Sequence, residues 1–325
     1  MKTHWPRQQP LLSLDAAGAE ALLRPLAPEA RVIEVTPLRG GLINTNLRVR
    51  LAGQGAPLLL RLYQRGAAEA RKEASIARLL QGRVPAARVL HVADDNPVTG
   101  HAYAVFDWIE GECLDLVLPG FDDEALEALG AAIGRALADI HGIGFERYGF
   151  FADDLTPGEA IELNGKGVLA YLRHGLTAGP ARARLGDALA DAQIALMTRE
   201  GAAIDDWQPP PCLVHGDFNP ANLLVRRDAQ GDWALAAVLD WEFAFSGTPP
   251  FDFGNLLRPP LGRHRGFTQA LAEGYRAAGG RLPDRWQRIA RLVDLTAWTE
   301  MLSRPTCADA VIEDAKRIIR ATMAD

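Results

Sequence analysis

The spacing of apolar residues changes near residue 110, and this change limits the possible fold more than any other feature of the chain. Before it, short runs alternate like half-buried strands: in residues 45–51, Leu47, Val49 and Leu51 alternate with polar side chains. After it, residues 126–140 carry leucine or isoleucine at intervals of three, four, four and three, the period of an amphipathic helix. The sequence therefore predicts a sheet-rich part followed by a helical part.

The remaining segments fit the same division. We expect strands at 31–38, 45–51, 57–63, 88–92 and 101–109, and helices at 13–26 and 67–80, in the first part. In the second part we expect two helices within 157–201, strands at 222–226 and 234–239, and helices across 265–323. The predicted fold class is α+β, with a small sheet lobe (residues 1–108), a larger helical lobe (residues 109–325) and a ligand cleft between them.

Charge and composition exclude several classes of protein. A net charge of −6 without basic runs argues against nucleic-acid binding. The chain begins without an apolar leader and contains no apolar run of 18 residues, so we expect a cytoplasmic protein that does not enter membranes. Its three cysteines form no CxxC pair, which argues against a disulfide framework or a cysteine zinc site. The oligomeric state is not visible in the sequence.

The segment LVHGDFNPANLL (213–224), followed by VLDWEFA (238–244), carries the chemistry. Phosphoryl transfer from a nucleotide needs one carboxylate to orient and deprotonate the acceptor hydroxyl, and further oxygen ligands for Mg²⁺. Asp217 and Asn222 place a carboxylate and a carboxamide at two ends of one loop, and Asp240 ends a second strand. A lone HGD or DW is usually a cap or a turn, but this combination predicts a phosphotransfer site.

These motifs closely resemble the catalytic loop and metal aspartate of the aminoglycoside phosphotransferase and choline kinase superfamily, which has a protein-kinase-like fold. Other segments resemble the same family over nearly the whole chain: LRGGLINTN (38–46), LLLRLYQ (58–64), EASIARLL (73–80), VPAARVL (84–90), YAVFDWIEGE (103–112) and FDFGNLLR (251–258). The resemblance implies that Asp217 is the catalytic base and that Asn222 and Asp240 bind Mg²⁺. It implies ATP as the phosphoryl donor, with GTP also open.

The sequence also suggests which residues bind the phosphates of the nucleotide. Arg61 lies mid-strand among leucines, where a charge needs a partner, and Glu73 is the obvious one. The resemblance implies that this pair grips the phosphates, although Arg61 could also be a surface residue of an edge strand. A phosphate loop is expected to use short polar side chains and flexible backbone: Gly40, Gly41, Asn44, Thr45 and Asn46. The alternative for these glycines is an ordinary hairpin turn.

Three further expectations concern the link between the lobes and the support of the catalytic loop. By resemblance, the Asp107 carbonyl and the Ile109 amide read adenine at the link between the lobes. Asp252 is expected to bond back to the catalytic-loop backbone, and His215 to brace the loop rather than act as a base.

The sequence indicates the acceptor and its binding residues less clearly than it indicates the rest of the site. Four residues are candidate acceptor contacts. The resemblance implies that Trp241 and Glu242 face the cleft, and Asp294 and Trp298 share a helix face, with a place in the core as the alternative for Trp298. Acidic residues near 153–162 form either a rim for a cationic acceptor or a solvated surface. The leading hypothesis is an ATP-dependent kinase for a hydroxyl of a small, possibly cationic acceptor such as an aminoglycoside. Choline, ethanolamine and homoserine remain open, as does a non-catalytic nucleotide-binding pseudokinase.

Overall fold

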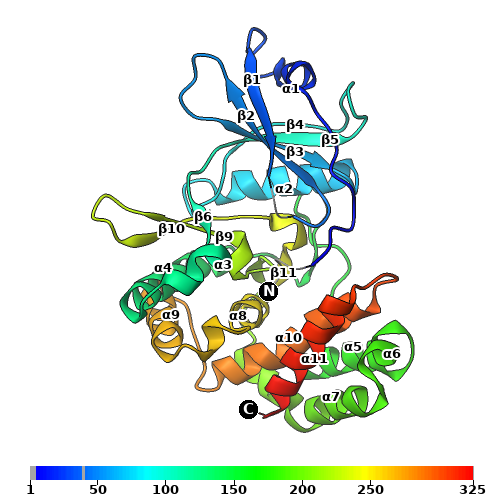
Figure 1. Cartoon of the computed structure of the whole chain (residues 1–325). Coiled ribbons are helices and arrows are strands. Elements are labelled where there is room, and N and C mark those ends of the chain that lie inside the picture. The colour runs from blue at the N-terminus through cyan, green and yellow to red at the C-terminus, as the bar shows by residue number, and fades with distance from the viewer. Residues whose placement is uncertain (1–4, 39–40, 325) are drawn as a thin grey trace.

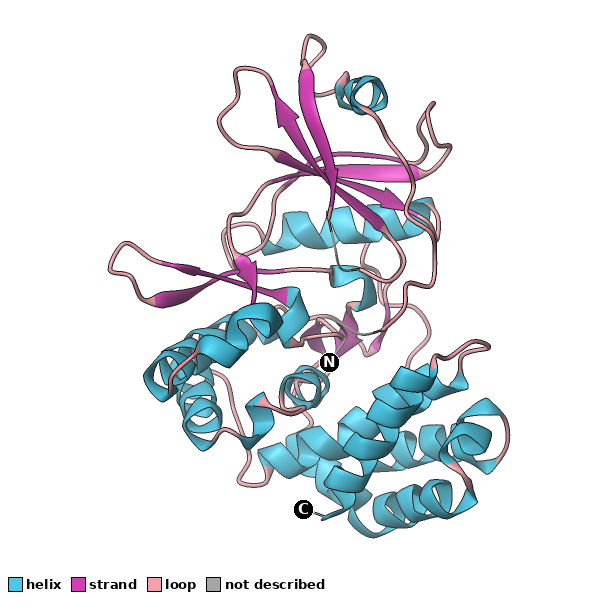
Figure 2. Ribbon diagram, viewed as in Figure 1, coloured by secondary structure: helices cyan, strands magenta, loops and turns pink. Residues whose placement is uncertain are grey.

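The computed structural model describes residues 5–38 and 41–324 and has two parts, a sheet-rich one and a mainly helical one (Figures 1 and 2). The predicted α+β class is confirmed: an antiparallel sheet forms the first part, and helices dominate the remainder. Among the described residues, no helix is both long and apolar enough to cross a membrane.

Five antiparallel strands form the first sheet, in the order β1-β2-β3-β5-β4. Their bounds are Val32–Pro37 (β1), Thr45–Leu51 (β2), Leu58–Tyr63 (β3), Val89–Ala93 (β4) and Ala102–Asp107 (β5). Helices α1 (Ala16–Leu23) and α2 (Ala67–Leu80) each pack in a separate apolar cluster with these strands. Because β3 lies in the middle of the sheet, its side chains are shielded and Arg61 is not on an edge strand.

Two small sheets lie between the first sheet and the helices. One has the order β10-β9-β6, from Trp233–Val238, Leu223–Arg227 and Glu112–Cys113, and the other the order β7-β11-β8, from Gly149–Phe150, Phe245–Gly247 and Cys212–Val214. Strands β6, β7, β8 and β11 contain only two or three residues each, too few for a periodic sequence signal. They hold the chain segments that precede and follow the loop at 215–222.

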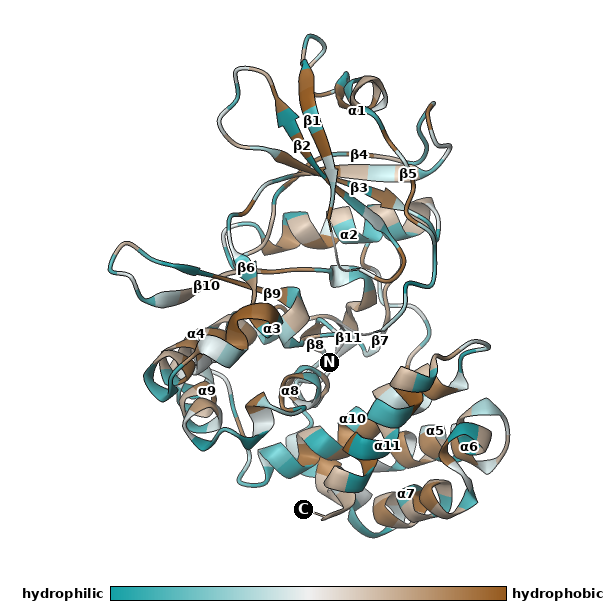
Figure 3. Cartoon of the chain, in the orientation of Figure 1, coloured by the Kyte–Doolittle hydropathy of each residue, from teal (hydrophilic) through white to brown (hydrophobic). Residues whose placement is uncertain are grey.

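Within the described part of the chain, the helical lobe contains nine α-helices. Their bounds are Leu114–Val117 (α3), Asp123–His141 (α4), Gly165–Thr177 (α5), Pro180–Leu185 (α6), Asp187–Glu200 (α7), Pro250–Leu256 (α8), Arg265–Ala277 (α9), Trp286–Ser303 (α10) and Asp309–Ala324 (α11). Helices α4 and α9 approach closely because Gly134 has no side chain: a Cβ there would lie 2.2 Å from the Leu271 carbonyl oxygen. Most of the apolar core lies among these helices, along which Figure 3 shows brown, hydrophobic residues mixed with teal, hydrophilic ones.

The long elements agree with the sequence predictions, and the differences have local causes. Residues 45–51 and 67–80 form β2 and α2 with the predicted bounds. Residues 157–201 form three helices instead of two, because Gly179 and Gly186, at φ 96° and 84°, each end one helix and allow the next to begin.

Candidate active site

The loop at residues 215–222 leaves β8 and returns through a short 3-10 turn, Pro220–Asn222, into β9. Gly216 makes this path possible, because its φ is 77° and a Cβ would lie 2.6 Å from the carbonyl oxygen of Phe243. The Leu239 amide also donates to the Asn222 main-chain carbonyl at 2.8 Å, which joins the end of the loop to the end of β10. The two sequence motifs are therefore adjacent in space.

Asp217 projects from the middle of the loop and is 8% exposed. The side-chain amide of Asn219 donates to Asp217 Oδ1, and that of Asn222 donates to Oδ2, both at 2.9 Å. Both oxygens of the carboxylate therefore accept bonds from side-chain amides of the same loop, which fix its orientation.

The loop backbone is supported from below by α8. Both Asp252 oxygens accept amide bonds at 2.9 Å, one from His215 and one from Gly216, and His141 Nε2 lies 3.1 Å from the same carboxylate. The His215 ring bonds the Leu239 carbonyl at 2.8 Å and accepts from the Asp217 amide at 3.2 Å. Because both ring nitrogens of His215 are engaged with backbone groups, this residue holds the loop in place.

Asp240 follows β10 in the left-handed region, with φ 64° and ψ 65°, an uncommon conformation for a residue other than glycine. Its Oδ1 accepts a bond of 3.1 Å from Arg61 Nη1. Its other oxygen has no hydrogen bond among the described residues. The side-chain carbonyl oxygen of Asn222 also has no hydrogen bond among the described residues, while its amide nitrogen donates to Asp217. These oxygens are hard donors of the kind that Mg²⁺ prefers.

Arg61 reaches this site from β3 and is 7% exposed. Its Nη1 also contacts Glu73 Oε1 of α2, while its Nε donates to Asn46 Oδ1 at 2.8 Å. Burial alone would lower the pKa of Arg61, but the charges of Glu73 and Asp240 raise that pKa well above its ordinary value. The guanidinium therefore stays charged and connects three segments of the site.

The predicted phosphate-loop residues are mostly engaged with the protein. Asn44 donates to Glu242 Oε2 at 2.9 Å and accepts from the Gln64 amide, and the Thr45 hydroxyl accepts from the Leu12 amide. Gly41 adopts a φ of 69°, while Gly40 lies outside the described residues. The side chains therefore shape the loop, and its backbone is what remains to approach a phosphate.

Glu242 and Trp241 occupy different surroundings from those expected of acceptor contacts. The Glu242 carboxyl group accepts from the Asn44 side chain at 2.9 Å, and its main-chain carbonyl accepts from the Lys72 amine. Burial, then the charges of Asp240 and Glu69, raise the pKa of Glu242 to about 9. Trp241 is 4% exposed, packs on His215 and donates its indole N–H to the Val238 carbonyl. Glu242 faces the phosphate loop, and Trp241 belongs to the core.

Asp294 and Trp298 are also turned inward. Asp294 forms a bidentate pair with Arg258, at 2.9 Å from Nε and 2.7 Å from Nη2, and accepts the Trp298 indole N–H at 3.0 Å. The Arg258 guanidinium stacks 4.4 Å from the Trp298 ring centre, and Trp298 is fully buried. Trp298 therefore has no surface with which to contact an acceptor directly.

The link between the lobes holds the two predicted adenine contacts. Asp107 ends β5, where it pairs with Leu58 of β3, and its carboxylate binds Arg88 through the backbone amide and the guanidinium. Ile109 follows β5 in the segment that runs to β6. The structure places both residues at the join between the sheet and the helical part.

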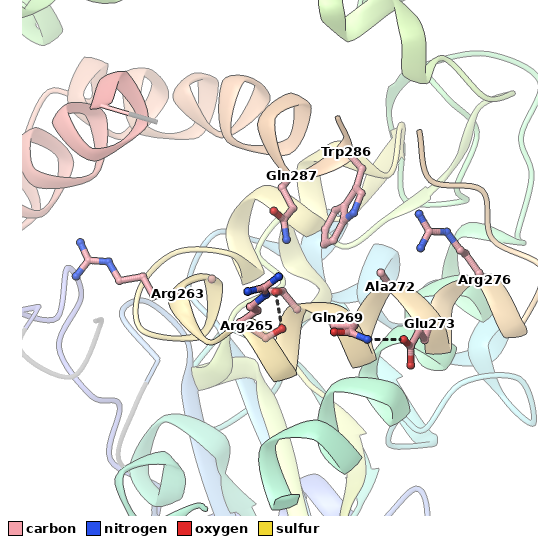
Figure 4. A pocket seen from close by; sticks show the side chains of 10 residues that line it. Arg263, Arg265, Gln269, Ala272, Glu273, Arg276, Trp286 and Gln287 are labelled. Atoms are coloured by element: carbon pink, nitrogen blue, oxygen red, sulfur yellow. Dashed lines mark hydrogen bonds between the residues drawn. The ribbon is translucent and has the colours of Figure 1, made fainter. Parts of the chain in front are cut away.

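Two hollows differ in their relation to the loop. The first, which we call the loop pocket, has a volume of about 320 Å³ and is lined by residues that include Trp5, Leu118, Asn219, Pro220, Arg258 and Pro260. The second, of about 440 Å³, lies along α9 and the start of α10, where Arg265 and Arg276 flank Gln269 and Trp286 (Figure 4). Of these two, the loop pocket alone shares residues with the 215–222 loop, so it is the one related to the candidate site.

Three residues that contribute to the candidate site or to the loop pocket were not identified from the sequence. Asn219 binds the Asp217 carboxylate, and its position two residues after that aspartate was the available signal. Arg258 and Trp5 join the pocket from distant positions, and no local pattern marks either of them.

A sequence model of the phosphotransferase enzyme family matches residues 34–292. No curated protein matches the chain. Among solved structures, a GDP complex of an aminoglycoside 2′-phosphotransferase-IIIa mutant superposes with a TM-score of 0.69 at 18% identity, covering 95% of this chain and 98% of that one. A ternary complex of aminoglycoside phosphotransferase APH(4)-Ia with AMP-PNP and hygromycin B gives 0.63 at 18% identity, covering 94% and 97%. At this identity the structural likeness establishes the shared fold.

Proposed function

The chain belongs to the phosphotransferase enzyme family and is a kinase that acts on an alcohol group, and from this premise we propose that it transfers the γ-phosphoryl group of ATP or GTP to a hydroxyl of a small molecule. The observation that carries this proposal is the meeting of Asp217, Asn222 and Asp240 at the ends of two adjacent strands. Solved structures of the same fold hold AMP-PNP, ADP or GDP, which supports a nucleotide as the donor.

We assign the proton transfer to Asp217. Its carboxylate is oriented by two side-chain amides and would accept the acceptor's hydroxyl proton. As the hydroxyl oxygen bonds to the γ-phosphorus, the bond from that phosphorus to the bridging oxygen breaks and the nucleoside diphosphate leaves. The fixed loop holds the base in position before the acceptor arrives.

The nucleotide contacts are divided between the two lobes in this proposal. Residues 1–108 would hold the nucleotide through the phosphate-loop backbone, the Arg61–Glu73 pair and the 107–109 link, and residues 109–325 would carry the catalytic loop and the acceptor. Asn222 and Asp240 would hold Mg²⁺, because each offers an unbonded oxygen toward the site. The ion would neutralise charge on the phosphates.

Replacement of the base tests this function. We expect Asp217→Asn to lower kcat in a coupled assay of nucleoside diphosphate release roughly 10²–10⁴-fold, because the carboxamide accepts no proton. Nucleotide affinity should survive, because Asp217 is not among the proposed nucleotide contacts. Asp228→Asn, in the exposed β9–β10 turn, is the matched control. Turnover of Asp217→Asn at the wild-type rate would contradict the assignment.

A further inference from the structure

The loop pocket adjoins the proposed base. Asn219 lines the pocket and donates its side-chain amide to Asp217 Oδ1 at 2.9 Å, and Pro220 and Ala221 continue the same wall. One hydrogen-bonded side chain thus separates the pocket from the carboxylate. A hydroxyl carried by a molecule in this pocket would lie beside the residue that orients Asp217.

The polar groups that face the pocket are few. Arg258 uses Nε and Nη2 on Asp294, which leaves Nη1 without a hydrogen bond among the described residues. His264 is engaged at both ring nitrogens, with Asp123 at 2.9 Å and with the Phe267 amide at 3.2 Å. Asp115 is the single carboxylate that the described residues contribute to the lining. Besides the side-chain amides of Asn219 and Asn255, the pocket therefore offers one guanidinium donor, already neutralised by its partner, and one carboxylate.

Apolar surface makes up most of the remaining wall. It comes from Trp5, Leu118, Leu126, Pro220, Pro260 and Leu261. Figure 3 shows the adjoining α3 in the brown of hydrophobic residues. A molecule with several ammonium groups would need a carboxylate for each group that leaves water, since burying an unpaired charge is costly.

The acidic residues near 153–162 do not supply those carboxylates. Asp153 binds Arg71 of α2, and its carbonyl accepts from Ser75, so it is held against the first lobe. No residue between 153 and 162 is part of the pocket lining. The acidic rim that the sequence left open is absent from this pocket among the residues that the structure describes.

One wall comes from a segment remote in sequence, residues 5–9, which we call the strap. The Trp5 indole donates to Asp314 Oδ2 at 3.1 Å and packs edge-to-face against Trp298, with ring centres 6.5 Å apart. Two residues later, Arg7 bonds the carbonyls of Ile43 and Asn44 at 3.0 and 3.1 Å. In Figure 1 the dark-blue chain descends from α1 to the centre of the molecule. The strap therefore joins the phosphate loop to the pocket.

From this placement we propose that the loop pocket is the acceptor site, that Trp5 forms one of its walls, and that it takes a hydroxylated compound with an apolar body and at most one charged group. The inference rests on the proposed kinase function. It differs from that function in excluding polycationic acceptors. A carboxylate, carbonyl or hydroxyl oxygen of the acceptor would bond Arg258 Nη1.

The test uses the full chain, and the rate of ADP release from MgATP without an added acceptor, with water as the acceptor, serves as the reference. The probes are 3-phenylpropan-1-ol and 3-hydroxy-3-phenylpropanoate on one side, and kanamycin and hygromycin B on the other. We expect at least one phenyl compound to change the rate of ADP release saturably, by three-fold or more, and the aminoglycosides to leave it unchanged. Trp5→Ala should raise the half-saturating concentration of that compound ten-fold or more.

Trp5→Phe keeps an aromatic wall but loses the bond to Asp314, so it should give an intermediate shift and covers the case in which Trp5→Ala fails to fold. Trp233→Ala, on β10 and outside the pocket, should leave the half-saturating concentration unchanged. Saturable phosphorylation of kanamycin or hygromycin B would overturn the inference, as would no effect of any probe on an enzyme that hydrolyses MgATP normally. Hydrolysis that persists unchanged in Asp217→Asn would instead contradict the proposed function itself.

Discussion

Gly216 sets the direction of the carboxylate that follows it. A side chain there would face two separate penalties, a left-handed φ of 77° and a contact of 2.6 Å with the Phe243 carbonyl oxygen. The left-handed conformation alone costs about 1–2 kcal/mol for a residue with a Cβ. The contact must be relieved by moving the loop, because its partner is a backbone atom.

We therefore expect Gly216→Ala to lower both the free energy of unfolding, by about 2 kcal/mol or more, and kcat. Gly231→Ala is the matched control, because Gly231 also has a positive φ, 90°, but a Cβ added there would meet no atom within 4 Å. The control should lose only the conformational cost and keep its turnover. Chemical denaturation and steady-state kinetics measure the two effects, and equal loss of kcat in both variants would contradict the role of the contact.

The contacts of Arg61 on β3 require its planar guanidinium group. Its Nε binds Asn46 and its Nη1 binds Glu73 and Asp240, which a single lysine amine at the end of a flexible stem cannot reproduce. Arg61→Lys should raise the Kd for MgATP roughly ten-fold, the equivalent of one lost charged hydrogen bond of about 1.5 kcal/mol. Isothermal titration calorimetry measures this change. Arg50→Lys, on the exposed side of β2, is the control, and an unchanged Kd in Arg61→Lys would refute the argument.

At the scale of elements, the three-stranded sheet β7-β11-β8 is the support of the 215–222 loop. Cys212 of β8 is buried, 4% exposed, and its thiol lies 3.5 Å from the Gly247 carbonyl of β11. Burial, and then the charge of Asp252, raise the pKa of the Cys212 thiol far above its ordinary value of 9.0. The folded protein therefore keeps this thiol protonated and unreactive.

The raised pKa of Cys212 makes the free energy of unfolding depend on pH. Above pH 9 the unfolded chain releases the Cys212 proton while the folded chain retains it, so the free energy of unfolding should fall as pH rises, by up to about 1.4 kcal/mol per pH unit from this group. Below pH 9 the group contributes no slope. Urea denaturation at pH 8 to 10 should show a steeper decline in wild type than in Cys212→Ala, and parallel curves would contradict the prediction.

The elements also show where sequence reasoning succeeds. Long periodic segments such as α2, α4 and β2 were predictable because seven or more residues repeat one burial pattern. The 215–222 loop was singled out because phosphoryl transfer requires particular residue types at fixed spacing, and the roles assigned to its residues stay predictions. Short strands such as β8 and β11 were not, since three residues acquire strand geometry from their neighbours and not from their own pattern.

At the scale of the whole molecule, the site spans both lobes, and a bound nucleotide should hold them together. A ligand that binds only the folded state stabilises it by about 2.7 kcal/mol at a free concentration of 100 times Kd. AMP-PNP with Mg²⁺ should therefore raise the Tm of the full chain. EDTA or Asp240→Ala should remove most of the increase, while Asp228→Ala should keep it, and an equal shift without metal would contradict Asp240 as a ligand.

The loop pocket could not be predicted from the sequence because its parts meet only in the folded molecule. Trp5 contacts Asp314, 309 positions away, and Arg258 reaches the pocket from the end of α8. Neither residue stands in a local pattern that separates a pocket wall from ordinary core. Trp241 and Trp298 were predicted to contact an acceptor, but the fold buries both side chains.

The strap also has a consequence for biosynthesis. A ribosome makes Trp5 309 positions before Asp314, and domains otherwise tend to fold as they emerge. The sheet can therefore form while Trp5 still lacks its partner, and the Trp5 wall of the pocket can be fixed only once α11 has been made. A nascent chain stalled before residue 309 would carry the 215–222 loop without that wall held in place.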